Sequence, residues 1–141
     1  MSRRIVDASV VAAAFFQEQH AAAARALLIS GRELHAPTLI VAELANVIWK
    51  RHVRREIDET EARELLADFH RLPLRLAPSI ELVAAALELA MGTGRTVYDC
   101  LYLALAVKRK GLLITADRRL ANALAGSPLA RHVAWIGQPV R

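Results

Sequence analysis

Four carboxylates interrupt apolar sequence, and their residue type and placement could do chemistry. Most other acidic residues lie in plainly polar surroundings. A carboxylate among apolar residues is costly to desolvate unless something compensates it, and a cation is a good compensator. Mg²⁺ and Mn²⁺ prefer oxygen ligands, and such ions can activate water and stabilise charge on a phosphodiester. We therefore expect a divalent-metal site for phosphodiester hydrolysis, built by Asp7, Glu43, Asp99 and Asp117.

Each of these carboxylates also has an ordinary structural explanation. Asp7 and Asp117 are suited to cap the helices that follow them. Thr96 and Asp99 resemble a capping box, T-x-x-D. Glu43 fits the surface of an amphipathic helix, although apolar residues surround it on several faces. Four such residues at one predicted edge of a sheet together favour the catalytic interpretation.

Other site chemistries find less support in the sequence. The five histidines are scattered without zinc-ligand spacing, and neither a P-loop nor a G-x-G-x-x-G loop is present. Ser9 occupies the position where an acid-pocket phosphatase usually has its second aspartate, and Asp7 lacks the acidic partner that a phospho-receiver domain needs. Ser9 also has no evident histidine partner, so we expect it to support the hydrogen bonds of the site or a helix start.

Strand-like runs alternate with helical patterns along the chain. The strand-like runs are RRIVDAS, ELHAP, LRLAP, GLLITAD and HVAWIG. Helical spacing predicts helices at 9–17, 19–30, 38–54, from Asp58 to before Pro73, and at 79–91, 97–110 and 118–125. This alternation predicts one α/β/α domain over 1–141 with a mainly parallel sheet of about five strands. In such sheets the site lies at the carboxyl ends of the strands, where Asp7 and Asp117 are expected.

Bulk composition is consistent with one intracellular domain. The 141 residues are enough for a core without disulfides, and the single cysteine, Cys100, allows no internal disulfide. No apolar run is long enough to cross a bilayer, and Asp7 interrupts the N-terminal apolar stretch early. We therefore expect a cytoplasmic protein without membrane association.

The basic residues indicate where a polyanion such as a nucleic acid would lie. The net charge of +5 favours polyanions, although weakly by itself. Glu43, Asn46 and Lys50 share one helix face, so Asn46 is expected to support the site and Lys50 to extend from it towards RNA. The alternative for Lys50 and the basic residues after it is that they only oppose the helix dipole. Further candidates for RNA binding are Arg95, Arg118 and Arg119.

Four segments in order resemble the motifs of PIN-domain ribonucleases, and more narrowly of VapC toxins from bacterial toxin–antitoxin pairs. They are IVDAS, PTLIVAELANVIWK, TVYDCLYLALA and LLITADRRL. The resemblance implies an α/β/α fold and Mg²⁺- or Mn²⁺-dependent endonucleolytic cleavage of RNA. It places Asp7, Glu43, Asp99 and Asp117 in the metal-binding cluster, with Thr115 as a supporting hydroxyl. It also implies an antitoxin partner that blocks the active-site groove, and a homodimer.

One position departs from the pattern of this resemblance. Some relatives carry another acidic residue two positions after the last aspartate, where this chain has Arg119. The number of metal ions therefore stays open. Fold alone does not fix function, so a module that holds RNA or protein without cutting is the alternative.

Overall fold

A computed structural model describes residues 3–138, which form a five-stranded sheet flanked by helices. Every strand pair is parallel, in the order β3-β2-β1-β4-β5. The strands are β1 (Arg4–Val6), β2 (Leu34–Pro37), β3 (Leu74–Ala77), β4 (Leu112–Thr115) and β5 (Val133–Trp135). The predicted α/β/α fold with about five strands is confirmed, and the sheet is parallel throughout.

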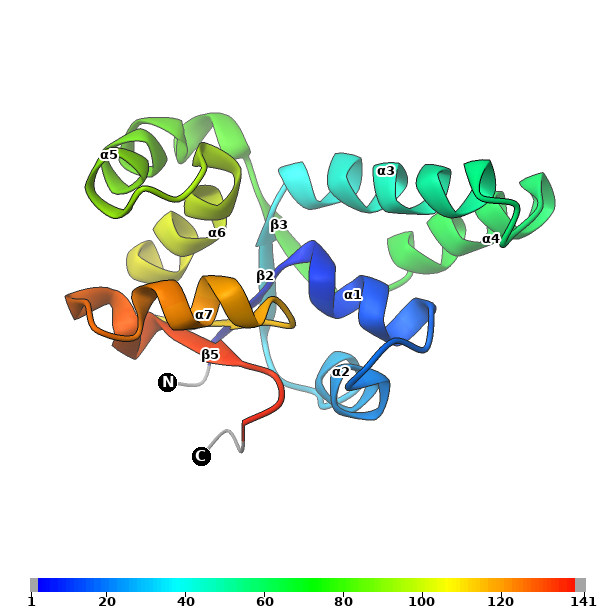
Figure 1. Ribbon diagram of the computed structural model, residues 1–141, viewed down its shortest axis with the longest axis horizontal. Coiled ribbons are helices and arrows are strands. Elements are labelled where there is room, and N and C mark those ends of the chain that lie inside the picture. Colours follow the sequence, from blue (N-terminus) through cyan, green and yellow to red (C-terminus); the bar gives the residue numbers. More distant parts are fainter. Residues whose placement is uncertain (1–2, 139–141) are drawn as a thin grey trace.

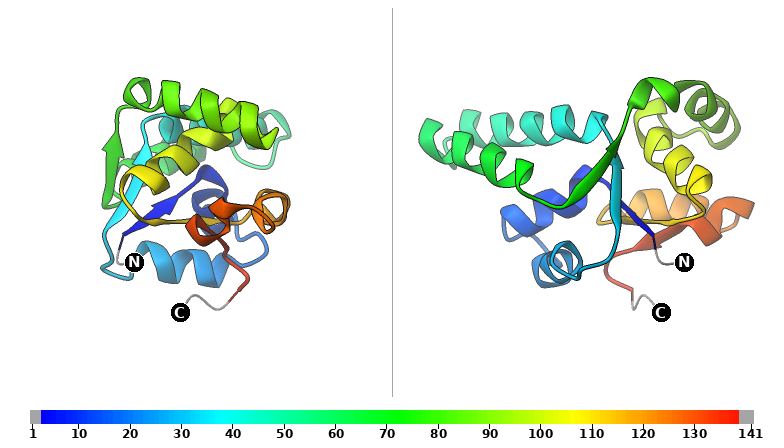
Figure 2. Two further views of the ribbon diagram at one scale, coloured as in Figure 1. Left: turned by 90° about the vertical axis from the view of Figure 1, so that its left-hand side faces the viewer. Right: turned by 180° about the vertical axis from the view of Figure 1, so that it is seen from behind.

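The helices fill the connections between successive strands. They are α1 (Ala8–Phe15), α2 (Ala21–Leu28), α3 (Leu39–Val53), α4 (Glu59–His70), α5 (Val83–Thr93), α6 (Val97–Lys108) and α7 (Arg118–Leu124), with 3-10 turns η1 (Ser79–Glu81) and η2 (Pro128–His132). Figure 1 shows α1 to α4 on one side of the sheet and α5 and α6 on the other. Figure 2 shows the same layering from the side and from behind. Among residues 3–138, no helix is long and apolar enough to span a membrane.

One predicted helix was wrong at its start. The sequence predicted a single helix at 79–91, but Ser79–Glu81 forms η1 and the α-helix begins at Val83. The Ser79 hydroxyl explains the interruption, because it accepts the Leu39 N–H at 2.9 Å and so ties this turn to the start of α3. The helix then continues through Gly92 and ends at Gly94, whose positive φ of 74° suits glycine.

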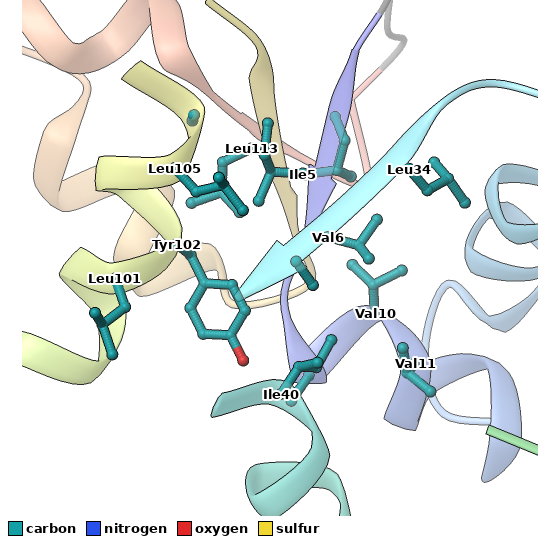
Figure 3. Packing of buried hydrophobic residues seen from close by; sticks show 14 of the residues in the cluster. Ile5, Val6, Val10, Val11, Leu34, Ile40, Leu101, Tyr102, Leu105 and Leu113 are labelled. Atoms are coloured by element: carbon teal, nitrogen blue, oxygen red, sulfur yellow. The ribbon is translucent and has the colours of Figure 1, made fainter. Parts of the chain in front are cut away.

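The core lies between the sheet and its helices. The short strands β1 and β4 are almost entirely buried, and α6 is buried on every side from Cys100 to Ala106. Figure 3 shows side chains from β1, β2, β4, α1, α3 and α6 meeting in one cluster. Because β1 and β4 are central and adjacent, the loops after them are held on a rigid base.

Central and edge strands should differ in their tolerance to truncation. Leu113 of β4 is 0% exposed, whereas Leu76 of the edge strand β3 is 43% exposed. We expect Leu113→Ala to lower the free energy of unfolding by about 2–5 kcal/mol, because it removes buried methyl groups and leaves a cavity. Leu76→Ala is the matched control and should cost less than about 1 kcal/mol. Urea denaturation of both variants tests this, and equal losses would contradict the assigned core.

Candidate active site

Asp7 directly follows β1 and is the most buried of the four predicted carboxylates, at 8% exposure. It caps α1, because its Oδ1 accepts the N–H groups of Ser9 and Val10 at 3.1 and 3.4 Å. Its Oδ2 accepts the Thr115 hydroxyl at 2.6 Å. Asp7 therefore does cap α1, but only its Oδ1 takes part, and its Oδ2 faces β4.

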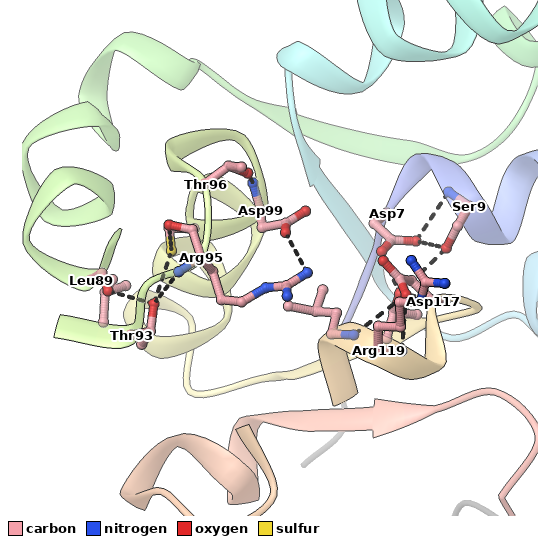
Figure 4. Close-up of polar contacts among 12 residues, drawn as sticks. Asp7, Ser9, Leu89, Thr93, Arg95, Thr96, Asp99, Asp117 and Arg119 are labelled. Carbon is pink, nitrogen blue, oxygen red and sulfur yellow. Dashed lines mark hydrogen bonds and ion pairs between the residues drawn. The ribbon is translucent and has the colours of Figure 1, made fainter. Parts of the chain in front are cut away.

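Ser9 and Thr115 connect the loops after β1 and β4. The Ser9 hydroxyl donates to Asp7 Oδ1 and accepts the Ala116 N–H at 2.9 Å. The Thr115 hydroxyl donates to Asp7 and accepts the Asp117 N–H at 3.0 Å. Figure 4 shows Asp7, Ser9 and Asp117 gathered in this way. The network fixes the Asp7 carboxylate and holds Asp117 beside it.

Burial perturbs the ionisation of Asp7. Desolvation raises the pKa of this carboxyl to about 6, and the nearby charge of Glu43 adds to the rise. Hydrogen bonds from Ser9, Thr115 and Val10 lower the pKa but offset only part of the desolvation. Such an environment favours a bound cation, which would restore the charged form.

Glu43 enters the same region from the second turn of α3. The buried Tyr102 of α6, 3% exposed, donates its hydroxyl to Glu43 Oε1. Burial raises the pKa of Glu43, the Tyr102 hydrogen bond lowers it, and the charge of Asp99 raises it. Burial and Glu43 raise the pKa of Tyr102 well above its usual range, so the phenol stays a donor.

Asp99 lies in the first turn of α6, which Thr96 caps by accepting the Asp99 N–H at 3.1 Å. Of the predicted T-x-x-D capping box, the hydrogen bond to the Thr96 side chain is therefore formed. The Asp99 carboxylate instead accepts Arg95 Nη2 at 3.1 Å. Figure 4 shows the Arg95 side chain reaching towards Asp99. Arg95 therefore supplies a counter-charge to Asp99.

Asp117 follows β4 by two residues and caps α7. Its Oδ1 accepts the N–H groups of Arg119 and Leu120 at 3.0 and 3.4 Å. The link to Asp7 passes through the Thr115 hydroxyl rather than directly. Asp117 is thus held at the same sheet edge, with its second carboxylate oxygen left for other partners.

The arrangement suits an ion that needs few protein ligands. Within residues 3–138, no three Asp, Glu, His or Cys side chains converge closely enough to enclose a metal ion. Mg²⁺ is usually held by one or two carboxylates and keeps several waters, so a closed cage is not required. The donors are oxygens, and electrostatic coupling links Asp7 with Glu43 and Glu43 with Asp99. The donor set fits Mg²⁺ or Mn²⁺.

The predicted polar and basic residues divide into two groups. Lys50 and Arg118 line a cleft of about 520 Å³ that also includes Ser9 and Asp117. Asn46 and Arg119 are exposed and do not line that cleft. Lys50 and Arg118 are therefore placed to extend the site, whereas Asn46 and Arg119 lie beside it.

The sequence pattern of the PIN domain matches residues 4–124. The chain belongs to the PIN domain family. Ribonuclease VapC3 of Pyrobaculum aerophilum is 37% identical over 84% of this chain and 92% of its own length. Ribonuclease VapC9 of Mycobacterium tuberculosis is 30% identical over 84% of this chain and 88% of its own.

Solved structures show the same PIN fold. The crystal structure of PAE2754 from Pyrobaculum aerophilum superposes with a TM-score of 0.70 at 21% identity, covering 96% of this chain and 84% of that one. A toxin–antitoxin complex from Klebsiella pneumoniae superposes with a TM-score of 0.62 at 17% identity, covering 93% and 95%. The family membership predicted from the four motifs is confirmed.

Sequence reasoning missed Tyr102 as part of this candidate site. It lies three residues after Asp99, so both share one side of α6. Its hydroxyl is the polar group of a run of otherwise apolar buried side chains from Leu101 to Ala106. A hydroxyl in such a run needs a partner, and that need was the available signal.

The raised pKa of Asp7 predicts a pH-dependent stability. This carboxyl contributes stability that is present below its ordinary pKa of 3.8 and is lost as the pH rises through about 6. One pKa unit corresponds to about 1.4 kcal/mol, so ionising Asp7 costs the folded state about 3 kcal/mol. In EDTA, Asp7→Asn should therefore melt at a higher temperature than the parent at pH 7.5, with the difference shrinking towards pH 4.

Asp68→Asn is the control for this measurement, because Asp68 is exposed on α4 and, among residues 3–138, its carboxylate pairs with Arg71 alone. Its melting temperature should follow the parent at every pH. An Asp7→Asn variant that melts at or below the parent across pH 4–7.5 would contradict the desolvation of Asp7.

Proposed function

We propose that this PIN domain is a Mg²⁺- or Mn²⁺-dependent endoribonuclease that acts in the cytoplasm as the toxin of a toxin–antitoxin pair. The observation that carries the proposal is the buried Asp7 carboxylate, organised by Ser9 and Thr115 and coupled in charge to Glu43. The ribonuclease names of the relatives at 37% and 30% identity support it.

Asp7, Glu43, Asp99 and Asp117 are the proposed catalytic and metal-binding residues. A bound divalent ion would lower the pKa of a water and neutralise charge on the phosphodiester. The chain itself fixes the carboxylates: Ser9 and Thr115 orient Asp7, and the Tyr102 hydroxyl orients Glu43. Preorganised groups of this kind need little rearrangement during reaction.

RNA would approach along the cationic side chains beside these carboxylates. Lys50 and Arg118 share a cleft with Ser9 and Asp117, so both are proposed to bind the RNA backbone. Arg95 and Arg119 are further proposed contacts, and Asn46 is proposed to support the site from α3. Arg95 is tied to Asp99 and so joins the acidic cluster to this basic surface.

An antitoxin is the proposed protein partner. The structures of similar fold include toxin–antitoxin complexes from Klebsiella pneumoniae and Rickettsia felis. An apolar groove of about 260 Å³ between α3 and α4 includes Ile48, Trp49 and Leu66, and Trp49 is 57% exposed. Grooves of this kind accept an amphipathic helix from another protein, so we assign this groove to a helix of the antitoxin. Another part of the antitoxin is proposed to block the active-site groove.

A non-catalytic RNA- or protein-binding module on the same fold is the second candidate. The Asp99–Arg95 ion pair and the absence of three converging ligands among residues 3–138 favour it. Such a module would bind RNA in excess EDTA and cut none with any divalent ion.

Loss of single carboxylates should abolish cleavage. With total cellular RNA in Mg²⁺ or Mn²⁺, we expect Asp7→Asn and Asp99→Asn to lower the cleavage rate by at least about 100-fold, because each removes a charged ligand. Asp68→Asn makes the same chemical change on the exposed surface of α4 and should cut like the parent. EDTA should stop cleavage by all active forms, and metal-independent cleavage would contradict the proposed mechanism.

A homodimer is the second proposed assembly. An exposed apolar stripe follows η1 and α5, with Ile80 at 85%, Leu87 at 48% and Met91 at 65% exposure. Several large apolar side chains exposed on one short segment of chain are typical of a protein–protein contact. Figure 1 shows α5 at the outer limit of its layer, where the same stripe of a second copy can meet it about a two-fold axis.

Charge placed in this stripe should separate the copies. We expect Leu87→Glu to shift the mass measured by light scattering from dimer to monomer, because it would bury an unpaired carboxylate at the interface. Glu88→Gln changes the adjacent exposed residue without adding charge and should leave the dimer intact. A parent protein that is monomeric at about 100 μM would overturn this assignment.

A further inference from the structure

The cleft in which Lys50 and Arg118 are proposed to meet the RNA backbone begins at Asp117 and extends beyond the proposed metal-binding carboxylates. Ser9 and Asp117 lie in its wall with the loop before α2, the outer half of α3 and β5. Its volume of about 520 Å³ falls within the range of about 300–1,000 Å³ typical of small-ligand sites. It is therefore large enough for more than a water or an ion.

The cleft carries more positive charge than its two carboxylates, Glu18 and Asp117, can match. Lys50, Arg54 and Arg118 line it, and none of them forms an ion pair within residues 3–138. The acidic Glu18 in its wall is already bound by Arg51 at 3.2 Å. The charge that remains suits an anion.

Arg118 differs from the other cleft cations because its guanidinium is held. It stacks on the Trp135 indole with 4.8 Å from Cζ to the ring centroid. The His20 ring meets the same indole edge-to-face at 5.0 Å. A Cβ added to Gly137 would lie 2.6 Å from the indole Cζ2, so the backbone there also packs on the ring. Trp135 is thus fixed from several directions, and it fixes Arg118.

We propose that this cleft binds the backbone phosphate of one unpaired RNA nucleotide adjoining the cleavage site, with Arg118 as its principal ligand. Lys50 and Arg54 add charge along the strand, and Trp135 is a positioning residue that presents the guanidinium. A planar guanidinium matches phosphate in a two-point geometry, and stacking reduces the freedom it loses on binding. The assignment rests on the proposed ribonuclease function.

An RNA phosphate explains the cleft better than an acidic protein segment. Its wall includes Asp117, so its occupant lies next to the carboxylates that are proposed to act on a phosphodiester. A protein carboxylate in the cleft would also be repelled by Asp117, and it would have no bond for these carboxylates to hydrolyse. Poly-glutamate of matched length separates the two occupants, and we expect it not to displace RNA.

The test is RNA binding in EDTA, where cleavage does not interfere. Fluorescence anisotropy of a labelled single-stranded oligoribonucleotide gives Kd at several salt concentrations. We expect Arg118→Gln to weaken binding about 10-fold and to reduce the salt slope by about 0.7, as for one lost phosphate contact. Lys108→Gln removes the same charge at the far end of α6 and should change Kd less than 2-fold.

The positioning role of Trp135 has its own readout. Trp135→Leu keeps every charge, yet we expect it to weaken binding about 5-fold, whereas Trp135→Phe should restore most of the affinity. In a Trp49→Phe background, Trp135 is the sole tryptophan, and its emission should change saturably with RNA. Circular dichroism of each variant checks that it is folded. If Trp135→Leu does not fold, the Kd of Arg118→Gln and the RNA-dependent change in Trp135 emission decide the test.

Three outcomes would overturn the proposal. They are unchanged Kd for both Arg118→Gln and Trp135→Leu, losses matched by Lys108→Gln, and displacement of RNA by poly-glutamate at equal concentration. The ribonuclease function is judged separately by Asp7-dependent cleavage. If the variants change Kd as expected but the parent does not cut RNA, the phosphate subsite stands and the ribonuclease function is wrong. If the parent cuts RNA but the variants leave Kd unaltered, only the phosphate subsite is wrong.

Discussion

The burial of the Asp7 carboxylate is the constraint on which the site depends. A charged group at 8% exposure is tolerated only when donors and counter-charges surround it. Ser9 comes from α1, and Thr115 comes from β4, so satisfying Asp7 requires the loops after two strands to meet. Their parallel pairing at adjacent central positions provides that meeting. Desolvation raises the pKa of this carboxyl and the hydrogen bonds offset only part of the rise, so a cation would relieve what remains.

The rule for parallel sheets therefore explains only half of the site. Asp7 and Asp117 follow paired strands, and their common edge could be predicted from the alternating elements. Glu43 and Asp99 come from α3 and α6, which lie on opposite sides of the sheet. The Tyr102–Glu43 hydrogen bond joins these two layers over the strand ends. The two helix layers are thus connected at the site by a side-chain hydrogen bond as well as by the sheet between them.

The features that could be predicted from the sequence are those set by the strands, and the features that could not are those set by contacts between elements. The five strands, the family and the position of Asp7 were predictable, because periodicity and a carboxylate after an apolar run are local signals. The ion-pair partner of Asp99 was not predictable, because the turn between Gly94 and Thr96 decides where the Arg95 side chain lies. The η1 turn was missed for a similar reason, since Ser79 hydrogen-bonds α3 forty residues away. Both features depend on side-chain hydrogen bonds between residues outside one regular helix or strand, and such contacts produce no periodic pattern in the sequence.

Charge placement resolves a conflict built into any acidic site for a polyanion. Carboxylates that attract a divalent ion also repel RNA, and the +5 net charge of the chain does not by itself say where attraction occurs. Here the counter-charges flank the carboxylates: Arg95 pairs with Asp99 on one side, and the Arg118 guanidinium stacks on Trp135 on the other. One arginine is bound to an acid and the other is held by an aromatic ring. The Asp99 carboxylate offsets much of the field of Arg95, whereas the indole that supports Arg118 carries no charge. The aromatic support therefore leaves the Arg118 charge available to the phosphate of the proposed substrate.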